Sequence, residues 1–230
     1  MLVRDAGARI EVYMARRSAR RAIMPDAYVF PGGALDERDA SERVVARLDG
    51  VPNGIDAPFA VAALRELLEE AGVLLAATSD GCEPAPAQVA AARAALASGT
   101  DFAEILERGG WQLRGSELAY YSRWITPPGE VARRFDARFF AARAPDGQAA
   151  AADAVEVHDG VWIAPADALQ RFERGEWTIV FPTLRHLERL TAFASVAEFV
   201  AHARTRRPVP VMPDMTPEGA ISLPAALQAW

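Results

Sequence analysis

The sequence contains no lysine, so arginine supplies every fixed positive charge in its 230 residues. The formal net charge is −6, and the arginines gather only in short groups such as Arg204, Arg206 and Arg207. Because duplex nucleic acid is bound through many phosphate contacts, we expect no nucleic-acid partner for so acidic a chain. A small anionic ligand is still compatible, since two or three well-aimed guanidinium groups are enough to hold one.

Cysteine and long apolar runs are also scarce. Cys82 is the only cysteine, which excludes an intramolecular disulfide and fits a reducing cytoplasm. No apolar run approaches the roughly 18–20 residues of a membrane-spanning helix, and the first residues lack the layout of an export signal. With 51% hydrophobic residues, the chain is expected to be a cytoplasmic protein without a membrane partner, folded as one domain over residues 1–230.

Strand-like and helix-like segments mix along the chain. Alternating β-formers predict strands at 2–3, 11–16, 27–30, 73–76, 118–125, 135–142, 154–157 and 160–163, with short edge strands in 208–213 and 220–224. Helical spacing predicts helices at 166–174, 182–190 and 196–204, and an alanine-rich pair within 83–108 that breaks near Ser98-Gly99-Thr100. This mixture indicates an α+β fold.

The clearest helix covers residues 56–72. Asp56 can cap its start, Pro58 is tolerated in its first turn, and Gly72 can end it. One apolar stripe runs along it, formed by Val61, Leu64, Leu67, Leu68 and Ala71.

The same helix carries a cluster of carboxylates in the segment RELLEEAGV, residues 65–73. Glu66, Glu69 and Glu70 share a face, and Arg65 stands four residues before Glu69 and can pair with it. One arginine cannot neutralise three carboxylates, whereas a hard divalent cation can. The alternative is an ordinary solvated helix face. A strand and the turn Pro31-Gly32-Gly33 precede the helix, and that order favours a metal and phosphate site.

RELLEEAGV is similar to the second half of the Nudix box, in which Gly-x5-Glu-x7 precedes Arg-Glu-U-x-Glu-Glu-x-Gly-U, with U aliphatic. Counted from Gly33, the first glutamate position holds Asp39, and 25 residues separate Asp39 from Arg65, an insertion of 18. Such an insertion resembles the peroxisomal CoA-diphosphatase branch of the family and its bacterial relatives. YVFPGGALDERDA and YYSRWITPPGEVARRFDARFF also look like that branch, so the resemblance covers residues 11–213.

The resemblance implies an α/β/α sandwich with a mixed β-sheet, the Nudix helix and an additional helical insert. On this basis, the box insertion is expected at about residues 40–57, the helical insert at about 83–110 and a C-terminal helical extension at about 182–230. The quaternary structure stays open, with a homodimer as one option.

The reaction implied by the resemblance is hydrolysis of a nucleoside diphosphate linked to another moiety, with Mg²⁺ or Mn²⁺ as cofactor. CoA or acyl-CoA, giving 3′,5′-ADP and a phosphopantetheine product, is the leading substrate. ADP-ribose, a dinucleotide and a non-catalytic nucleotide-sensing module are the alternatives. A second signature of CoA-cleaving members is half present, because Arg17-Ser18 match it whereas Ala22 and Asp26 replace its later arginine and glycine.

Residue roles follow from the same resemblance. Glu69 and Glu70, with Glu66 and the carbonyl of Gly32, would bind the metal. Glu66 would also orient or deprotonate the attacking water, and Arg65 would lock the carboxylates by ion pairing. Glu70 is counted with Glu66 and Arg65 as catalytic, since its replacement by glutamine is expected to remove nearly all turnover. Close approach of the backbone to the metal would explain the glycines of the turn.

Other positions are weighed against ordinary structural roles. Arg17, Gly33 and Arg123 are candidates for substrate binding, although arginines at strand ends are commonly solvated. The candidates for a further carboxylate from a later loop are Glu156 first, then Asp153 and Glu117, each against a plain surface position. Trp124, Phe135 and Phe139 are expected in the core, and the three histidines show no metal-ligand spacing.

Overall fold

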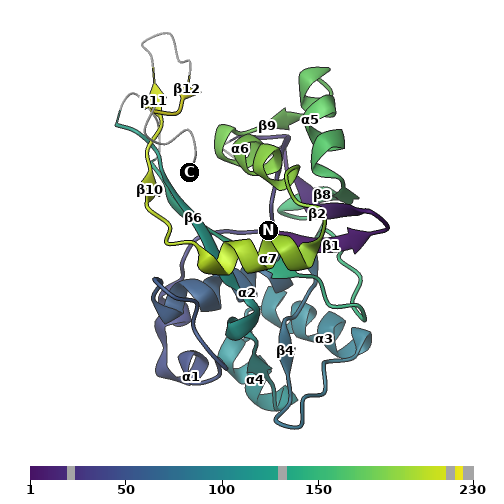
Figure 1. Cartoon of the computed structure of the whole chain (residues 1–230). Helices are drawn as coiled ribbons and strands as arrows, with labels where there is room; N and C mark the ends of the chain where they lie inside the picture. The colour runs from purple at the N-terminus through teal and green to yellow at the C-terminus, as the bar shows by residue number, and fades with distance from the viewer. Residues whose placement is uncertain (20–23, 129–133, 216–220, 225–230) are drawn as a thin grey trace.

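A mixed β-sheet forms the centre of the molecule (Figure 1). The computed structural model describes residues 1–19, 24–128, 134–215 and 221–224. The sheet order is β10-β6-β7-β1-β2-β3-β9, with β8 paired to β2. Its strands are β1 Leu2–Ala6, β2 Arg9–Arg17, β3 Ala27–Val29, β6 Ala119–Ile125, β7 Asp136–Arg143, β8 Val157–Ile163, β9 Thr178–Ile179 and β10 Pro210–Val211. The β10–β6, β7–β1 and β3–β9 pairs are parallel and the others antiparallel, which confirms the mixed sheet.

Helices cover both faces of this sheet. One layer contains α1 Glu42–Val45, α2 Ala57–Ala71, α3 Pro86–Ala97 and α4 Phe102–Gly109. The other contains α5 Pro165–Glu173, α6 Phe181–Leu190 and α7 Val196–Thr205, and α7 crosses the front of the sheet in Figure 1. In the described parts of the chain, no helix is long and apolar enough to cross a membrane.

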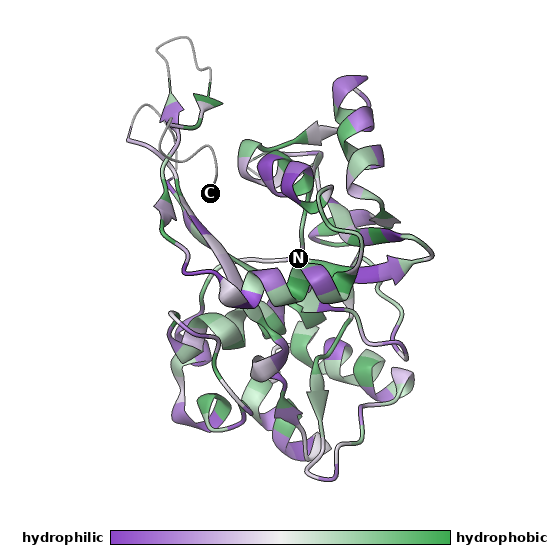
Figure 2. Cartoon of the chain, in the orientation of Figure 1, coloured by the Kyte–Doolittle hydropathy of each residue, from purple (hydrophilic) through white to green (hydrophobic). Residues whose placement is uncertain are grey.

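Two hydrophobic cores result, one on each face. Along β2, Tyr13 belongs to the core beneath α2 and Met14 to the core beneath α6 and α7, because successive strand residues point to opposite faces. Figure 2 shows hydrophobic residues where the helices meet the sheet and hydrophilic residues on the outer surfaces. The predicted α/β/α arrangement is therefore confirmed.

Helix α2 follows the sequence prediction closely. Its apolar stripe is buried, Pro58 lies in its first turn, and Gly72 ends it in the left-handed conformation at φ +64°. Asp56 occupies the N-cap position, but its side chain makes no capping hydrogen bond, so that part of the prediction was wrong.

The helical insert and the C-terminal helices lie where they were expected, whereas two strand predictions were wrong. Residues 73–75 are buried but form no strand, because the side chain of Gln148 binds both N–H and C=O of Leu74, at 2.8 and 3.0 Å. Only Ala76–Ala77 pairs, as β4, with β5 Gln112–Leu113. Near residue 154 the chain turns, since Ala154 has φ +62°, and a single strand, β8, follows.

The C-terminal tail contains the expected edge strand β10, which pairs with β6 at the edge of the sheet. β12 Ile221–Ser222 instead belongs to a separate two-stranded sheet with β11 Asp214–Met215, and this sheet was not predicted. β9 was not predicted, since Thr178–Ile179 is too short to show a periodicity of its own.

Candidate active site

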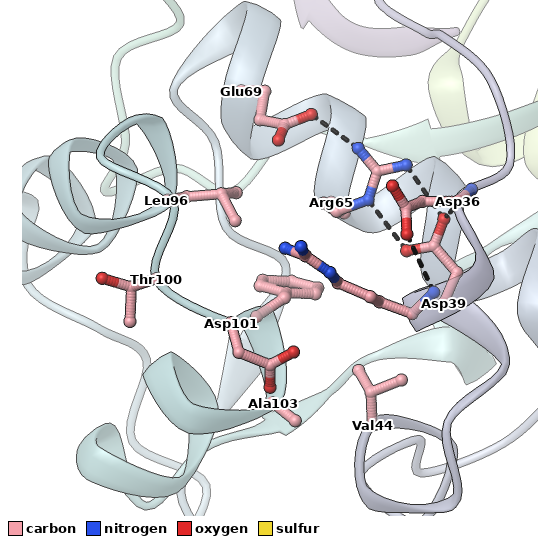
Figure 3. Close-up of a pocket in the computed structure, with 12 residues that line it drawn as sticks. Asp36, Asp39, Val44, Arg65, Glu69, Leu96, Thr100, Asp101 and Ala103 are labelled. Carbon is pink, nitrogen blue, oxygen red and sulfur yellow. Dashed lines mark hydrogen bonds and ion pairs between the residues drawn. The ribbon is translucent and has the colours of Figure 1, made fainter.

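Arg65 lies at the centre of the carboxylate cluster on α2. Its Nη1 donates to Glu66 Oε1 at 2.9 Å and to Glu69 Oε2 at 2.7 Å. Its Nε and Nη2 donate to the two oxygens of Asp39 at 2.8 and 2.9 Å. Figure 3 shows Arg65 between Glu69 and Asp39, beside a pocket of about 100 Å³ whose far side carries Thr100 and Asp101. The expected Arg65–Glu69 pair is present, and Arg65 holds two further carboxylates.

Asp39 joins the site although the insertion separates it from α2 in sequence. It is only 2% exposed and also accepts a hydrogen bond from the main-chain N–H of Asp36, at 2.8 Å. This bond belongs to the capping box of the 3₁₀ helix η1, Glu37–Ala40. Asp39 therefore contacts Arg65 although 25 residues separate the two in sequence.

The turn after β3 closes over the same carboxylates. The N–H of Gly32 donates to Glu70 Oε2 at 2.8 Å. A Cβ added to Gly33 would lie 2.5 Å from the carboxylate of Glu66, and Gly32 has φ +156° with open space around it. A side chain at 33 would thus displace the carboxylate of Glu66 from its present position, and glycine is favoured at 32 by conformation. The close approach seen here is between the backbone and a carboxylate, whereas the sequence had suggested one to a metal.

Burial changes the proton affinity of the three glutamates. It is the largest cause that raises the pKa of Glu66, Glu69 and Glu70. For Glu70 the pKa rises to about 7; the charges of Glu66 and Asp153 add to the effect of burial, and the Gly32 N–H opposes it. For Arg65, burial lowers the pKa, but its carboxylate partners raise it by more. The cluster therefore holds more negative charge than one guanidinium can balance.

The donor set fits a hard divalent cation. Three carboxylates on one helix, largely withdrawn from water and short of positive charge, supply the oxygen ligands that Mg²⁺ and Mn²⁺ prefer. Among the described residues, no three His, Cys, Asp or Glu side chains already converge on one point. In this structure, Arg65 holds one oxygen each of Glu66 and Glu69, and the N–H of Gly32 holds one oxygen of Glu70.

A later loop, residues 146–156, docks on the end of α2. The N–H of Ala151 donates to the carbonyl of Ala71 at 2.8 Å, and Gln148 binds Leu74. Asp153 in this loop accepts hydrogen bonds from the N–H groups of residues 155–157. Burial is the largest cause of the raised pKa of Glu70, and the negative charge of Asp153 raises it further.

The three candidates for a later carboxylate therefore differ in their surroundings. Glu156 is exposed, and its main-chain carbonyl accepts a bond from Ser18 at 2.9 Å. Glu117 pairs with Arg114 at 2.8 Å. Of the three, Asp153 is the one whose charge is among the causes that raise the pKa of Glu70, after burial as the largest cause.

The arginine candidates also separate. Arg17 is the last residue of β2 and lies opposite Val157. Burial has the largest effect on the pKa of Glu70 and raises it, whereas the charge of Arg17 lowers it. Arg123 on β6 forms a two-bonded ion pair with Asp136, at 2.8 and 2.7 Å. Arg204, Arg206 and Arg207 line a separate groove of about 680 Å³ with Asn53 and Gly54.

The structure explains how Asp26 can replace the glycine of the half-matched CoA signature. Asp26 stands where the signature has glycine, and its φ of +58° is the left-handed conformation that glycine adopts most readily. Asp is among the residues that tolerate this conformation, so the turn survives the replacement. Ala22, at the position of the second arginine, lies outside the described residues.

Aromatic residues and histidines take structural places. Trp124 is buried and Phe139 packs against the core beneath α6, as predicted. Phe135 is 43% exposed, so its placement in the core was wrong. His186 is fully buried, with Nε2 2.7 Å from Ser122 Oγ, and burial lowers its pKa to about 3.

Comparison with known proteins agrees with this geometry. The family model of the NUDT19 Nudix domain matches residues 46–190. The chain belongs to the Nudix hydrolase family. The Nudix match includes α2 and all its carboxylates, as well as the later loop with Asp153.

Curated relatives support the same branch of the Nudix family. The chain is 27% identical over 247 residues to the acyl-coenzyme A diphosphatase NUDT19 of Gallus gallus, covering 81% of this chain and 62% of the relative. It is 27% identical over 230 residues to the protein of the same name from Homo sapiens, covering 80% and 61%. The chain thus spans about three-fifths of the length of these relatives.

A solved Nudix structure confirms the fold. The crystal structure of a NUDIX hydrolase from Alicyclobacillus acidocaldarius superposes with a TM-score of 0.73 at 29% identity, covering 87% of this chain and 92% of that one. The family and its CoA-diphosphatase branch, which the split box indicated, are confirmed by the combined matches.

Proposed function

We propose that the protein is a metal-dependent diphosphatase that hydrolyses CoA or an acyl-CoA to 3′,5′-ADP and the corresponding phosphopantetheine. The observation that carries the proposal is the cluster around Arg65, where Asp39, Glu66 and Glu69 share one guanidinium. Glu70 adds a further buried carboxylate beside the glycine turn. The name of the relatives, acyl-coenzyme A diphosphatase, supports the choice of substrate.

Glu66, Glu69 and Glu70 would hold Mg²⁺ or Mn²⁺ together with the carbonyl of Gly32. The bound ion would supply neutralisation of the negative charge on the diphosphate. Arg65 keeps Glu66 and Glu69 on one side of α2, so both carboxylates start within a side-chain rotation of the site. Its bond to buried Asp39 anchors the guanidinium when they move.

Glu66 would act as the base for the attacking water. The water oxygen attacks a phosphorus atom, the proton passes to the Glu66 carboxylate, and the P–O bond of the anhydride breaks. Burial raises the pKa of Glu66, which makes it a stronger base than an exposed glutamate. Gly33 leaves the space in which this carboxylate lies.

Three positions would contact substrate, namely Arg17, Gly33 and Arg123. Arg17 is the best supported, since its charge acts on the carboxylate site from the end of β2. Arg123 would have to exchange its partner Asp136 for a phosphate. Asp153 is our choice for the later-loop carboxylate, ahead of Glu156. A homodimer and a cytoplasmic location stay predictions.

The test is incubation with CoA, ADP-ribose and NADH, with and without Mg²⁺, followed by chromatography of the products. We expect Mg²⁺-dependent release of 3′,5′-ADP from CoA. Cleavage of ADP-ribose but not CoA would overturn the substrate and leave a Nudix pyrophosphatase. If none of the three is cleaved with Mg²⁺ or Mn²⁺, the protein is instead a nucleotide-sensing module.

A further inference from the structure

An arginine from the helical insert holds the C-terminal end of α2. Arg93 is the only charged residue of α3, and it shares one side of that helix with Val89, Ala92 and Leu96. Val89 and Ala92 are buried, so this side of α3 faces the protein. The Nε and Nη2 of Arg93 both donate to the main-chain carbonyl of Glu69, at 2.9 and 2.8 Å.

This contact satisfies a carbonyl that the helix itself leaves open. In a continuing helix the carbonyl of Glu69 would accept from the N–H of Val73, but that N–H turns back to Leu67, at 3.4 Å. The guanidinium takes its place and brings a positive charge to the negative end of the helix dipole.

Gly72 makes room for the guanidinium. The chain turns there at φ +64°, and an added Cβ would lie 2.9 Å from Nη1 of Arg93. The glycine that ends α2 therefore also admits the side chain that binds the end of α2.

We propose that Arg93 is a positioning residue, which fixes the turn of α2 that carries Glu69 and Glu70 and so sets the geometry in which they bind a divalent cation. Two arginines bind Glu69: Arg93 donates to its main-chain carbonyl, and Arg65 donates to its side-chain carboxylate at 2.7 Å. When metal binding draws the side chain away from Arg65, the main-chain contact to Arg93 holds the residue in place. The inference rests on the proposed function, and it gives the helical insert a role in the site.

Mn²⁺ affinity of the full chain tests the inference, measured from the electron paramagnetic resonance signal of free Mn²⁺ during titration. Removing a side chain that orients metal ligands commonly weakens metal binding about 10–100-fold, and we expect at least about 10-fold for Arg93→Met. Arg93→Lys should recover part of the affinity, since lysine keeps the charge but lacks the two-pronged donor. Val89→Ala, on the same side of α3, should lower stability and leave the affinity unchanged.

Each outcome decides between the two claims. Wild-type affinity in folded Arg93→Met would overturn the inference and leave the proposed function intact. Equal weakening by Val89→Ala would also overturn it, since the effect would then come from packing of the insert. If Arg93→Met does not fold, Arg93→Lys decides, and full wild-type affinity there contradicts us. No Mn²⁺ binding by the wild-type protein would overturn the inference, and the proposed function falls with it only if CoA is also not cleaved with Mg²⁺.

Discussion

At the scale of single residues, the site depends on how one guanidinium is shared. Arg65 has a 12% exposed side chain, and it binds buried Asp39 through two hydrogen bonds while its remaining nitrogen holds Glu66 and Glu69. Asp39 is thus the fixed partner, and the two glutamates are the movable ones. The chain also offers an exposed pair of the same chemistry, Arg123 with Asp136, as a comparison.

Asp39→Asn should destabilise the protein strongly. It removes the charge of Asp39 and replaces one of the two oxygens that accept from Arg65 with an NH₂ group, and a hydrogen bond to a charged group contributes about 1.5–3 kcal/mol to the unfolding free energy. Asp136→Asn weakens contacts with Arg123 and Arg138 that lie at the surface, and it should cost less than about 1 kcal/mol for each ion pair. Urea denaturation of both variants measures the difference, and equal losses would show that Asp39 is not the buried anchor of Arg65.

Glu70 should make the metal-free protein less stable as the pH rises. Its pKa is about 7 in the fold against 4.5 for the free side chain, so between these values the folded state keeps a proton that the unfolded state releases. Unfolding free energy therefore falls as pH rises from 4.5 to about 7, by at most roughly 3 kcal/mol. Glu70→Gln, which cannot ionise, should be more stable than wild type at pH 8 in EDTA.

The measurement is urea denaturation of wild type and Glu70→Gln at pH 5 and pH 8. His186 acts in the opposite direction, because its buried neutral ring, with a pKa of about 3, loses stability as pH falls below 6.5. Both proteins share this histidine, so their difference isolates Glu70. A stability difference that is the same at the two pH values would contradict the raised pKa.

Contacts between residues close together in the sequence could be predicted, whereas contacts between distant residues could not. The Arg65–Glu69 pair follows from helical spacing alone. The bonds from Arg65 to Asp39 and from Gly32 to Glu70 join residues 26 and 38 positions apart, and no local pattern predicts them. The box alignment indicated the position of Asp39, but its burial and its two bonds to Arg65 come from the fold.

At the scale of elements, the end of α2 is where separate segments meet. Gly32 of the glycine turn donates to the side chain of Glu70, whereas Arg93 of α3 and Ala151 of the loop at 146–156 donate to main-chain carbonyls of α2. Helix α2 could be predicted because its periodicity and its terminal glycine are local signals. The path of residues 73–75 could not, because a distant glutamine, Gln148, replaces the strand partner.

The later loop yields a direct comparison of two carboxylates. Asp153→Asn should lower the turnover rate about 10-fold or more, as expected for a residue that supports a metal site, while an asparagine can still accept bonds from the turn. Glu156→Gln, three residues later and exposed, should keep wild-type turnover. The steady-state rate with Mg²⁺ measures both. The reverse result would restore Glu156, the first choice from sequence, as the later carboxylate.

At the scale of the whole molecule, one sheet with a core on each face carries helices in two layers. Residues 40–56, which contain α1, lead to the start of α2, and α3 and α4 pack into the same core as α2. The helix layers on both faces could be anticipated from the resemblance. The order of the strands could not, since parallel pairs such as β1 with β7 join distant parts of the chain.

The central claim is that the glutamates of α2 form the active site of a diphosphatase. Its most direct test is the rate of Mg²⁺-dependent CoA hydrolysis by wild type and by Glu66→Gln, with 3′,5′-ADP separated by chromatography. We predict clear turnover by wild type and a loss of at least about 100-fold in Glu66→Gln, since general-base groups contribute about 10²–10⁴-fold. Wild-type turnover by folded Glu66→Gln would contradict this assignment of the site.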